Sequence, residues 1–400
     1  MPYGIDARSL MQGVQVITVV GAGLVGATLA IRLSQLGINV RLLERSPFSK
    51  PNGKDGINDG RTIAVTLGSK RFLEKCGLWQ NLEGTAQRIN YIRVFEQGSA
   101  WTLDYDYQEL GNEPMGYIIE FDRLIEAVYE GVKTADNIEI IPNCELVQIS
   151  EGEVTSKTHG IFKSQLVVGA DGRNSWVRSQ VNIKSSTKEY GHKALVAHFV
   201  HEKPHNATAW EVFMPSGPFA MLPMINTTDG KHQSGIVWCG SKDTDWETIP
   251  DNELEQKLIE IFPFYGNVKL CSKRWIFPLS ALTVDTITAP RTILVGDAAH
   301  ALHPIAGQGV NLGWRDVAEL ADLLEYAQNT GQDYGANFLL ERYRKKRHID
   351  QQGLYFFTDG LTRLCGIDSS MVSFIRQTGL GVVNKIPPLK RFFMKKAMGI

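Results

Sequence analysis

The chain has little of several features that mark common classes of protein. Its five cysteines are widely scattered among 400 residues and form no C-x-x-C pair, so the sequence predicts neither a zinc site nor a disulfide framework. We expect buried thiols in a reducing compartment. A formal net charge of −1 excludes the strong positive field of a nucleic-acid-binding protein. No run of about eighteen apolar residues is present, and residues 1–13 lack the apolar core of a secretory signal, so neither a membrane span nor an export signal is expected.

Hydrophobic residues make up 43% of the chain, which is enough for a large buried core. At this length we expect two intertwined domains rather than one. The sequence has no H-E-x-x-H pattern and no cluster of histidine and cysteine ligands, so no metal site is predicted.

The N-terminal part carries a dinucleotide-binding pattern. An apolar run at residues 15–20 predicts a buried strand, and GAGLVG at residues 21–26 fits the G-x-G-x-x-G turn that follows such a strand. A helical pattern and a second strand at residues 39–43 come next, and this strand ends at Glu44, where an acid can bind a ribose hydroxyl. The negative charge of Glu44 argues against a cofactor with a 2′-phosphate at this position. The residues expected to contact the dinucleotide are Gly21, Gly23, Leu24, Val25, Gly26 and Glu44.

A second pattern, GDAAHALHPIAGQGVNLG at residues 296–313, lies between an apolar strand and a long helical stretch. Asp297 follows the strand, where its carboxylate can accept hydrogen bonds from a polyol, and the later glycines let backbone approach a flat ligand closely. The following helix would direct its positive N-terminal end at that ligand. A ribitol chain and a flavin ring satisfy both requirements, so the two patterns together predict FAD. No second G-x-G-x-x-G turn follows a strand, so a nicotinamide cofactor would bind without a Rossmann domain of its own.

Three blocks of sequence resemble the flavoprotein monooxygenases of the para-hydroxybenzoate hydroxylase fold. They are GAGLVG at residues 21–26, VVGADGRNSWVR at residues 167–178 and GDAAHALHPIAGQGVNLG at residues 296–313. Three further blocks are similar to the ubiquinone-biosynthesis hydroxylases, most of all to the 2-polyprenyl-6-methoxyphenol hydroxylases: DGRTIAV at 59–65, GPFAMLPM at 217–224 and HPIAGQGVNLGWRDV at 303–317. The resemblance runs from about residue 14 to about residue 347.

The resemblance implies an α/β fold. A Rossmann-like FAD-binding domain is interleaved with a substrate domain built on an antiparallel sheet, and a helical C-terminus follows. Residues 314–346 indicate one long helix whose basic end, at 342–348, is solvated. The expected FAD-binding segments are 14–85, 116–187 and 285–348, the substrate-domain segments are 86–115 and 188–284, and the C-terminal helical segment is 349–400.

The resemblance also implies a reaction. NAD(P)H reduces the bound FAD, dioxygen adds to form a flavin C4a-hydroperoxide, and its distal oxygen hydroxylates a polyprenylated phenol, with 2-polyprenyl-6-methoxyphenol as the expected substrate. Two alternatives stay open. One is another flavoenzyme of the same fold, such as an epoxidase or a prenyl-lipid reductase, and the other is a non-catalytic prenyl-binding protein.

Further site residues follow from the family's blocks. Arg61 best matches an arginine near the flavin and its pyrophosphate, with a surface ion pair as the alternative, and Arg123 lies near the start of a predicted helix. Asp171 belongs to the Asp-Gly block, where it equally suits a helix cap. Pro304 and His303 are the candidates for a catalytic role, Pro304 by shaping the site around the flavin and His303 as a base, although such a histidine often only orders backbone. The remaining expected FAD contacts are Gly296, Asp297, Pro304, Gly307, Gly309, Val310 and Asn311.

Short runs between residues 194 and 282, bounded by Gly, Pro, Asn and Asp, predict the antiparallel strands of the substrate domain. Half of the side chains in such strands simply face the core. The expected substrate contacts in these strands are Phe213, Met221, Pro223 and Trp238.

The last residues differ in character from the rest. Between Lys385 and Ile400 the charged residues are all basic and lie among several apolar ones, a pattern that suits either an anionic membrane surface or an ordinary solvated helix. For an enzyme whose polyprenyl substrate dissolves in lipid, we expect a cytoplasmic protein that contacts the inner face of the membrane peripherally. A complex of ubiquinone-biosynthesis proteins is a further expected partner.

Overall fold

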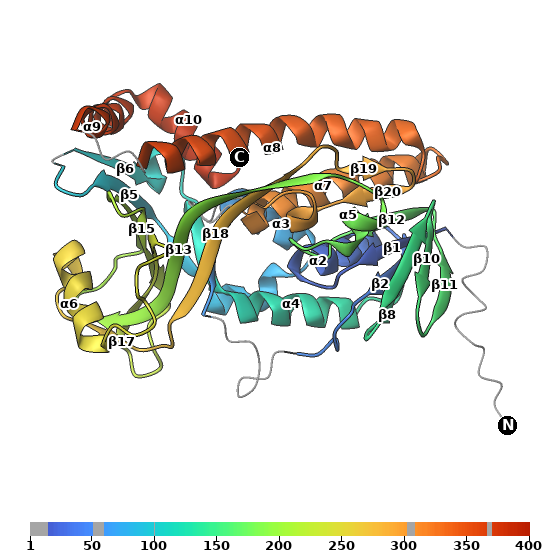
Figure 1. The fold of residues 1–400 in the computed structure, drawn as a ribbon, viewed down its shortest axis with the longest axis horizontal. Helices are drawn as coiled ribbons and strands as arrows, with labels where there is room; N and C mark the ends of the chain where they lie inside the picture. Colours follow the sequence, from blue (N-terminus) through green and yellow to red (C-terminus); the bar gives the residue numbers. More distant parts are fainter. Residues whose placement is uncertain (1–14, 51–59, 100, 302–308, 366–369) are drawn as a thin grey trace.

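The computed structural model describes residues 15–50, 60–99, 101–301, 309–365 and 370–400 (Figure 1). One half of the molecule is built on a mainly parallel sheet, in which only β19 runs antiparallel to its neighbour. The apolar run of β1 is buried along its whole length, as is typical of a central strand covered on both faces. The strand order is β19 (Thr288–Ala289), β20 (Thr292–Leu294), β12 (Leu166–Gly169), β1 (Val16–Val20), β2 (Asn39–Leu43) and β8 (Ile138–Ile141).

Helices pack around this sheet. α2 (Leu24–Gln35) contacts both α4 (Phe121–Lys133) and α7 (Gly309–Asn329). It stops at Gly37, whose φ of 76° lies in the left-handed region, and the amide of Ile38 bonds back to the carbonyl of Leu33. The helices α3 (Leu67–Lys75) and α5 (Trp176–Gln180) complete this half, which we call the FAD-binding half.

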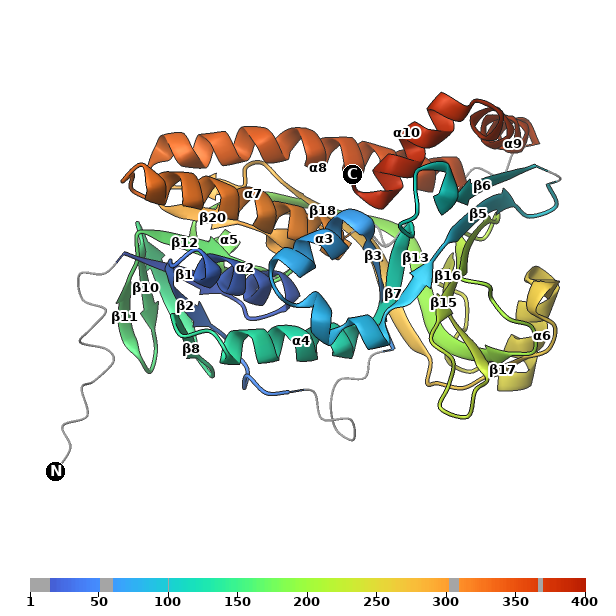
Figure 2. The same ribbon diagram turned by 180° about the vertical axis from the view of Figure 1, so that it is seen from behind.

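The other half is built on a largely antiparallel sheet, which we call the substrate sheet (Figure 2). Helix α6 (Asp251–Ile261) packs against one face through Leu254 and Leu258. β14 pairs with β5 in parallel, and the other pairs are antiparallel. The strand order is β17 (Val268–Leu270), β13 (Ser185–His201), β16 (His232–Ser241), β15 (Phe219–Met224), β14 (Thr208–Phe213), β5 (Tyr91–Glu96) and β6 (Thr102–Asp106), and β18 (Trp275–Val284) also pairs with β13.

Two small sheets flank this arrangement. One joins the two halves and consists of β3 (Thr62–Thr66), β7 (Gly116–Glu120) and β4 (Gln87–Ile89). The other consists of β9 (Leu146–Ser150), β10 (Glu153–Ser156) and β11 (Gly160–Lys163), and it lies at the end of the molecule opposite to α6 (Figures 1 and 2).

The predicted single helix over residues 314–346 is wrong, because two helices occupy this region. α7 ends at Asn329 and α8 (Asn337–Cys365) begins after a turn. Gly331 has a φ of 65°, which ends the first helix, and a Cβ on Gly335 would lie 2.3 Å from the carbonyl oxygen of Gln165. Residues 342–348 therefore lie within α8 rather than in a solvated last turn.

The chain ends in two helices beside the edge of the substrate sheet. α9 (Ser370–Lys385) contacts β5 and β6, and α10 (Pro387–Met398) follows it (Figure 1). Met394 and Met398 of α10 are buried in a cluster with residues of β7 and β15. Across the described ranges, no helix has the length and apolar character needed to cross a membrane.

The cysteines differ in part from the expectation. Cys76, Cys144 and Cys239 are buried, but Cys271 is exposed. Cys271 directly follows β17, which lies at the edge of the substrate sheet.

Candidate functional site

The glycine turn after β1 is shaped by close backbone contacts. Gly21 has a φ of 101°, and a Cβ there would lie 2.5 Å from the carbonyl oxygen of Ala170. A Cβ on Gly26 would lie 2.0 Å from the carbonyl oxygen of Gly21. Gly23 caps α2 without a side-chain hydrogen bond, and a Cβ on it would meet nothing within 4 Å. The turn therefore presents open space next to the amides of a helix N-terminus, which suits a pyrophosphate.

Glu44 lies beside this turn, at the end of β2. Its Oε2 accepts a hydrogen bond from the amide of Ala22 at 2.8 Å, and its Oε1 accepts one from the amide of Ser46 at 2.9 Å. The carboxylate is thus fixed next to the glycine turn, and each oxygen keeps a second lone pair that a ribose hydroxyl can use.

The Gly-Asp motif packs directly against the glycine turn. A Cβ on Gly296 would lie 3.2 Å from the side chain of Val25, and a Cβ on Gly313 would lie 2.7 Å from it. Glycine at both positions lets the start of α7 and the end of β20 approach α2. The two motifs, almost three hundred residues apart in the chain, therefore form one continuous surface.

Asp297 lies on this joined surface. Its side chain is exposed to solvent, yet burial by the surrounding protein raises its pKa, against the opposing charges of His300, Arg173 and Arg61. Exposure and desolvation together place the carboxylate at a concave surface with three basic side chains around it. A carboxylate in this setting fits an acceptor for the hydroxyls of a ribitol chain.

A buried ion-pair network supports the Gly-Asp motif from behind. Asp316 of α7 is 0% exposed, and its Oδ2 accepts hydrogen bonds from the amide of Gly296 at 2.9 Å and from Nε2 of His300 at 2.7 Å. Its Oδ1 accepts one from Nε of Arg347 at 2.7 Å. Burial raises the pKa of Asp316, but the charges and hydrogen bonds of His300 and Arg347 outweigh it and lower that pKa to about 2. A fixed negative charge thus holds the turn that carries Asp297.

The sequence pattern does not single out Asp316, and it places Arg347 at a solvated helix end. The sequence of α7 contains four acids, so an acid in this helix does not by itself mark Asp316 as buried. His300 uses Nε2 for Asp316, whereas its buried Nδ1 has no hydrogen-bond partner among the described residues.

The Asp-Gly block is used for support as well. Asp171 accepts hydrogen bonds from Oγ of Ser175, the N-cap of α5, at 2.5 Å and from the amide of Val177 in its first turn at 3.0 Å, so it supports the start of α5. Arg178 donates to the carbonyl oxygens of Ala298 at 2.9 Å and of Arg173 at 2.9 Å. The block therefore fixes the position of the Gly-Asp motif. Ser175 caps α5, and Asp171 holds Ser175 and the first turn of this helix.

The two predicted arginines differ in their surroundings. The guanidinium of Arg61 stacks over the ring of Phe121 at 4.2 Å, and its charge acts on Asp297. Arg123 is exposed on the first turn of α4, where it pairs with Glu126 at 3.3 Å. The charge of Arg61 therefore reaches the candidate site. Arg123 is not among the charges that act on Asp297.

The loop before α7 falls only partly within the described residues. His303, Pro304 and Gly307 lie outside them. Gly309, Val310 and Asn311 begin α7. Asn311 accepts a hydrogen bond from the amide of Thr66 at 3.0 Å and donates one to the carbonyl oxygen of Ala64 at 2.8 Å, so it anchors α7 to β3.

The expected substrate residues divide between the two faces of the substrate sheet. Met221 and Trp238 pack with α6 in the core on one face, and strand alternation puts Pro223 on that face too. Phe213 lies on the opposite face, which we call the flavin-facing side because the sheet lies between α6 and the FAD-binding half (Figures 1 and 2). A substrate pocket on the flavin-facing side would be lined by Phe213 but not by Met221, Pro223 or Trp238.

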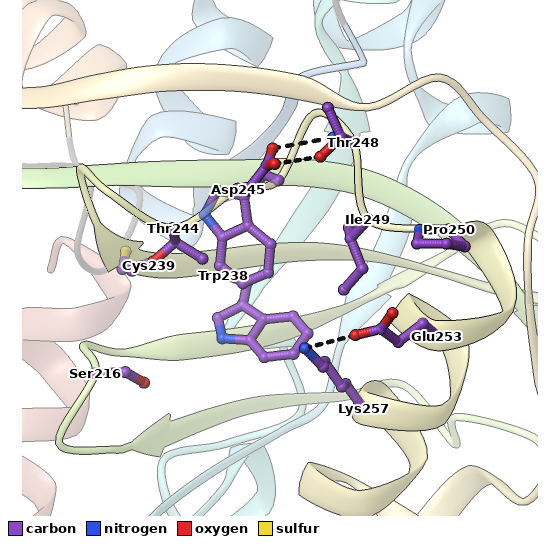
Figure 3. A pocket seen from close by; sticks show the side chains of 12 residues that line it. Ser216, Trp238, Cys239, Thr244, Asp245, Thr248, Ile249, Pro250, Glu253 and Lys257 are labelled. Carbon is purple, nitrogen blue, oxygen red and sulfur yellow. Dashed lines mark hydrogen bonds and ion pairs between the residues drawn. The ribbon is translucent and has the colours of Figure 1, made fainter.

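A cavity of about 540 Å³ opens on the α6 side of the sheet (Figure 3). Trp238 and Trp246 form its aromatic wall with ring centroids 4.8 Å apart, and Lys257 is paired with Glu253 at 3.0 Å. Because this cavity lies across the sheet from the FAD-binding half, it is separate from the candidate site. No group of three or more metal-ligating side chains occurs in the part of the chain that the structure describes.

Known proteins resemble this chain over nearly its whole length. The family model described as FAD binding domain matches residues 13–355. The ubiquinone hydroxylase UbiL of Rhodospirillum rubrum is 36% identical over 391 residues, which cover 96% of this chain and 89% of that protein. The 3-demethoxyubiquinol 3-hydroxylase of Escherichia coli is 28% identical over 396 residues, which cover 96% of this chain and 98% of that protein.

Among solved structures, the p-nitrophenol 4-monooxygenase PnpA from Pseudomonas putida superposes with a TM-score of 0.79 at 17% identity, and the match covers 96% of this chain and 98% of that one. This likeness concerns the fold. The matches together confirm the predicted fold, FAD as the cofactor and FAD-dependent monooxygenase as the class of enzyme. The chain therefore belongs to the FAD binding domain family, together with the ubiquinone hydroxylases.

Proposed function

We propose that this monooxygenase hydroxylates the ring of a polyprenylated phenol on the route to ubiquinone, with 2-polyprenyl-6-methoxyphenol as the expected substrate and NAD(P)H and dioxygen as co-substrates. The observation that carries the proposal is the 36% identity to a ubiquinone hydroxylase over 96% of the chain. Both flavin motifs are intact and packed against each other through Val25, which supports an enzyme rather than a binding protein.

Different residues would bind the cofactor and the substrate in such an enzyme. FAD, when bound, supplies the oxygen chemistry. The amides after Gly23 and the carboxylates of Glu44 and Asp297 hold the cofactor, while the Asp316 network keeps Asp297 in place. The flavin-facing side of the substrate sheet is lined mainly by apolar side chains, and we propose that a phenol ring lies against the part that α10, β4 and β7 leave uncovered, where apolar side chains exclude water.

Product analysis tests the proposal. The purified protein, loaded with FAD, is given NADH or NADPH and a short-chain prenyl phenol under labelled dioxygen. We expect one labelled oxygen atom in the ring of the product for each NAD(P)H consumed. A product that forms equally well without dioxygen would instead indicate a reductase, and a colourless protein that consumes no NAD(P)H would indicate a prenyl-binding protein.

The substrate is proposed to reach the enzyme from a membrane surface contacted by α10. Met394 and Met398 are buried inside the protein, and Lys390 pairs with Glu109 at 2.5 Å, so these three side chains do not contact a membrane. Phe392, at 54% exposed, and Ile400, at 46%, lie on the surface with Arg391, Lys395 and Lys396. Exposed apolar side chains among positive charges suit an anionic membrane surface, and each such charge contributes on the order of 1 kcal/mol near it.

Liposome binding tests this contact. Removal of residues 385–400 would expose the cluster around Met394. A triple substitution on the surface, Phe392→Ser with Lys395→Glu and Lys396→Glu, leaves that cluster covered and is therefore preferred. Binding to anionic vesicles is expected to fall at least tenfold, with FAD content unchanged. The control is Lys269→Glu with Lys273→Glu, which alters two exposed lysines near β17. Equal loss in the control, or no loss in the triple variant, contradicts a specific role for α10.

A further inference from the structure

A carboxylate lies on the flavin-facing side of the substrate sheet, in the middle of β14. Trp210 and Val212, its neighbours in the strand, pack with the α6 core, so Glu211 between them points to the other face. The register pairs Glu211 with Ala220 of β15 and with Val94 of β5. β15 lies between α6 and the FAD-binding half (Figures 1 and 2).

The surroundings of Glu211 are mostly apolar. Ala209 and Phe213 flank it on the same face of β14. Ala220 of β15 and Val94 of β5 are its cross-strand neighbours on that face. The titratable side chains that the register puts on this face are Glu96 of β5, Tyr105 of β6, Cys239 of β16, His198 of β13 and Lys269 of β17. Of these, His198 bonds to the carbonyl oxygen of Gly60 at 2.9 Å. From α9, which packs against β5 and β6, the nearest described charged residue is Lys385, and it stacks over Trp101 instead.

Glu211 makes no hydrogen bond or ion pair with any residue that the structure describes. Its side chain is half-buried, and burial is the one cause that raises its pKa, to about 8. Solvent therefore reaches this carboxylate in part, while protein surrounds much of it. An unpaired carboxylate on an apolar face lowers the stability of the folded protein unless a bound ligand donates hydrogen bonds to its oxygens.

We propose that Glu211 accepts the proton of the substrate's phenolic hydroxyl when the ring lies against the flavin-facing side of the substrate sheet. This inference rests on the proposed function. The O–H bond of the phenol breaks, the proton moves to a carboxylate oxygen of Glu211, and the electron pair stays on the phenol oxygen. The resulting phenolate is a better nucleophile at its ring carbons.

The proton returns later in the cycle. When the ring carbon that receives the oxygen atom loses its hydrogen as a proton and the ring becomes aromatic again, the phenol oxygen is protonated once more. The whole reaction consumes phenol, dioxygen, NAD(P)H and one proton, and it yields the hydroxylated phenol, water and NAD(P)⁺. Glu211 is unchanged at the end.

The apolar setting makes this carboxylate a suitable base. An ordinary glutamate, with a pKa of about 4.3, is a weak base toward a phenol with a pKa of about 10. Burial raises the pKa of Glu211 to about 8 and so narrows the gap to about two units. Because the base acts in its ionised form, turnover of a simple phenol is expected to rise with pH toward about 8.

The test compares three variants of the full-length, FAD-loaded enzyme. Glu211→Gln keeps the shape but removes the base, Glu211→Asp keeps the base one methylene further away, and Glu260→Gln on α6 alters an exposed acid on the other side of the sheet. Product formation and NAD(P)H consumption are measured between pH 6 and 9.5. We expect Glu211→Gln to lose at least a hundredfold in hydroxylation and to lose the rise with pH, to keep oxidising NAD(P)H without product, and to keep its FAD. Glu211→Asp is expected to retain part of the activity, and Glu260→Gln all of it.

A second arm separates proton acceptance from mere shape. Phenols with electron-withdrawing groups that ionise below pH 7 need no base, so they are expected to restore most of the Glu211→Gln activity. Unchanged turnover and pH profile in Glu211→Gln, or an equal loss with acidic and ordinary phenols, would overturn the proposal.

The ultraviolet spectrum of the bound phenol gives an independent readout, because a phenolate absorbs at longer wavelength than a phenol. Ionisation on binding to the native enzyme but not to Glu211→Gln supports the role of Glu211, and equal spectra in the two overturn it. If the native enzyme yields no hydroxylated product from any phenol, the proposed function fails, whatever the spectra show.

Discussion

Replacing Arg347 by leucine is expected to destabilise the FAD-binding half and to weaken FAD binding. Arg347 is 5% exposed, and its guanidinium is the cation that balances the buried carboxylate of Asp316. Leucine fills part of the space but leaves that charge without its partner, a change that costs about 3–5 kcal/mol. Because the amide of Gly296 and Nε2 of His300 still donate to Asp316, we expect the lower end, about 3 kcal/mol. Loss of order at Gly296 would then reach Asp297, the next residue.

Urea denaturation of the FAD-loaded and FAD-free protein measures the change in stability, and quenching of flavin fluorescence measures FAD affinity. Arg344→Leu is the matched control, because Arg344 lies one turn earlier in α8 and pairs with Glu341 at 2.7 Å on the surface. That exposed pair is expected to contribute less than about 1 kcal/mol. If Arg347→Leu destabilises the protein no more than Arg344→Leu does, or leaves FAD affinity untouched, the network does not support the cofactor site.

Three further outcomes follow from the site. Asp297→Ala should weaken FAD binding by about 1.5–3 kcal/mol, the worth of a hydrogen bond to a charged group, while Asp322→Ala on the surface of α7 should not, and equal affinities in a titration would remove Asp297 from the site. Glu44→Gln keeps one acceptor oxygen for the amide of Ala22 and should weaken FAD slightly, whereas Glu44→Arg should weaken it severely, so three equal dissociation constants would place the acid elsewhere. The folded-state pKa of Asp316 is lowered to about 2, so its contribution is fully present above about pH 4, near the pKa of an unfolded aspartate, and is lost as the pH falls toward 2. Acid denaturation curves of the native protein and Asp316→Asn should therefore approach each other below pH 4 and converge only near pH 2, and a constant difference between them would contradict this assignment.

The parts that the sequence predicted well are those whose signals are local. The strand at residues 16–20, the glycine turn, the helix after it and the acid at Glu44 follow one another within thirty residues, and each is decided by its own neighbours. A Cβ on Gly21 would meet Ala170, and a Cβ on Gly26 would meet Gly21, so both positions require glycine. The spacing of glycines in the sequence motif therefore reflects these contacts.

The parts that it missed depend on pairings between distant residues. Asp316 meets His300, sixteen residues away, and Arg347, thirty-one residues away, and neither spacing has a local meaning. An acid and an arginine on helices normally face water, so their burial follows only from how α7 and α8 pack. The same holds for Met221 and Trp238, because alternation along a strand gives two faces but does not say which one meets the cofactor.

The long strands β13 and β18 carry a consequence for how this fold varies. Their ladder pairs Ser185 with Val284, so the segment between these residues leaves the FAD-binding half and returns to it at two hydrogen-bonded neighbours. Because the ladder already holds the two ends of this segment together, a change in its length adds little loop-closure entropy to the folding of the FAD-binding half. The roughly one hundred residues in between can therefore change in length and lining wherever they are not paired with β5 or packed against α10, while the two ends stay joined. One oxygen-activating framework can thereby serve many differently shaped aromatic molecules.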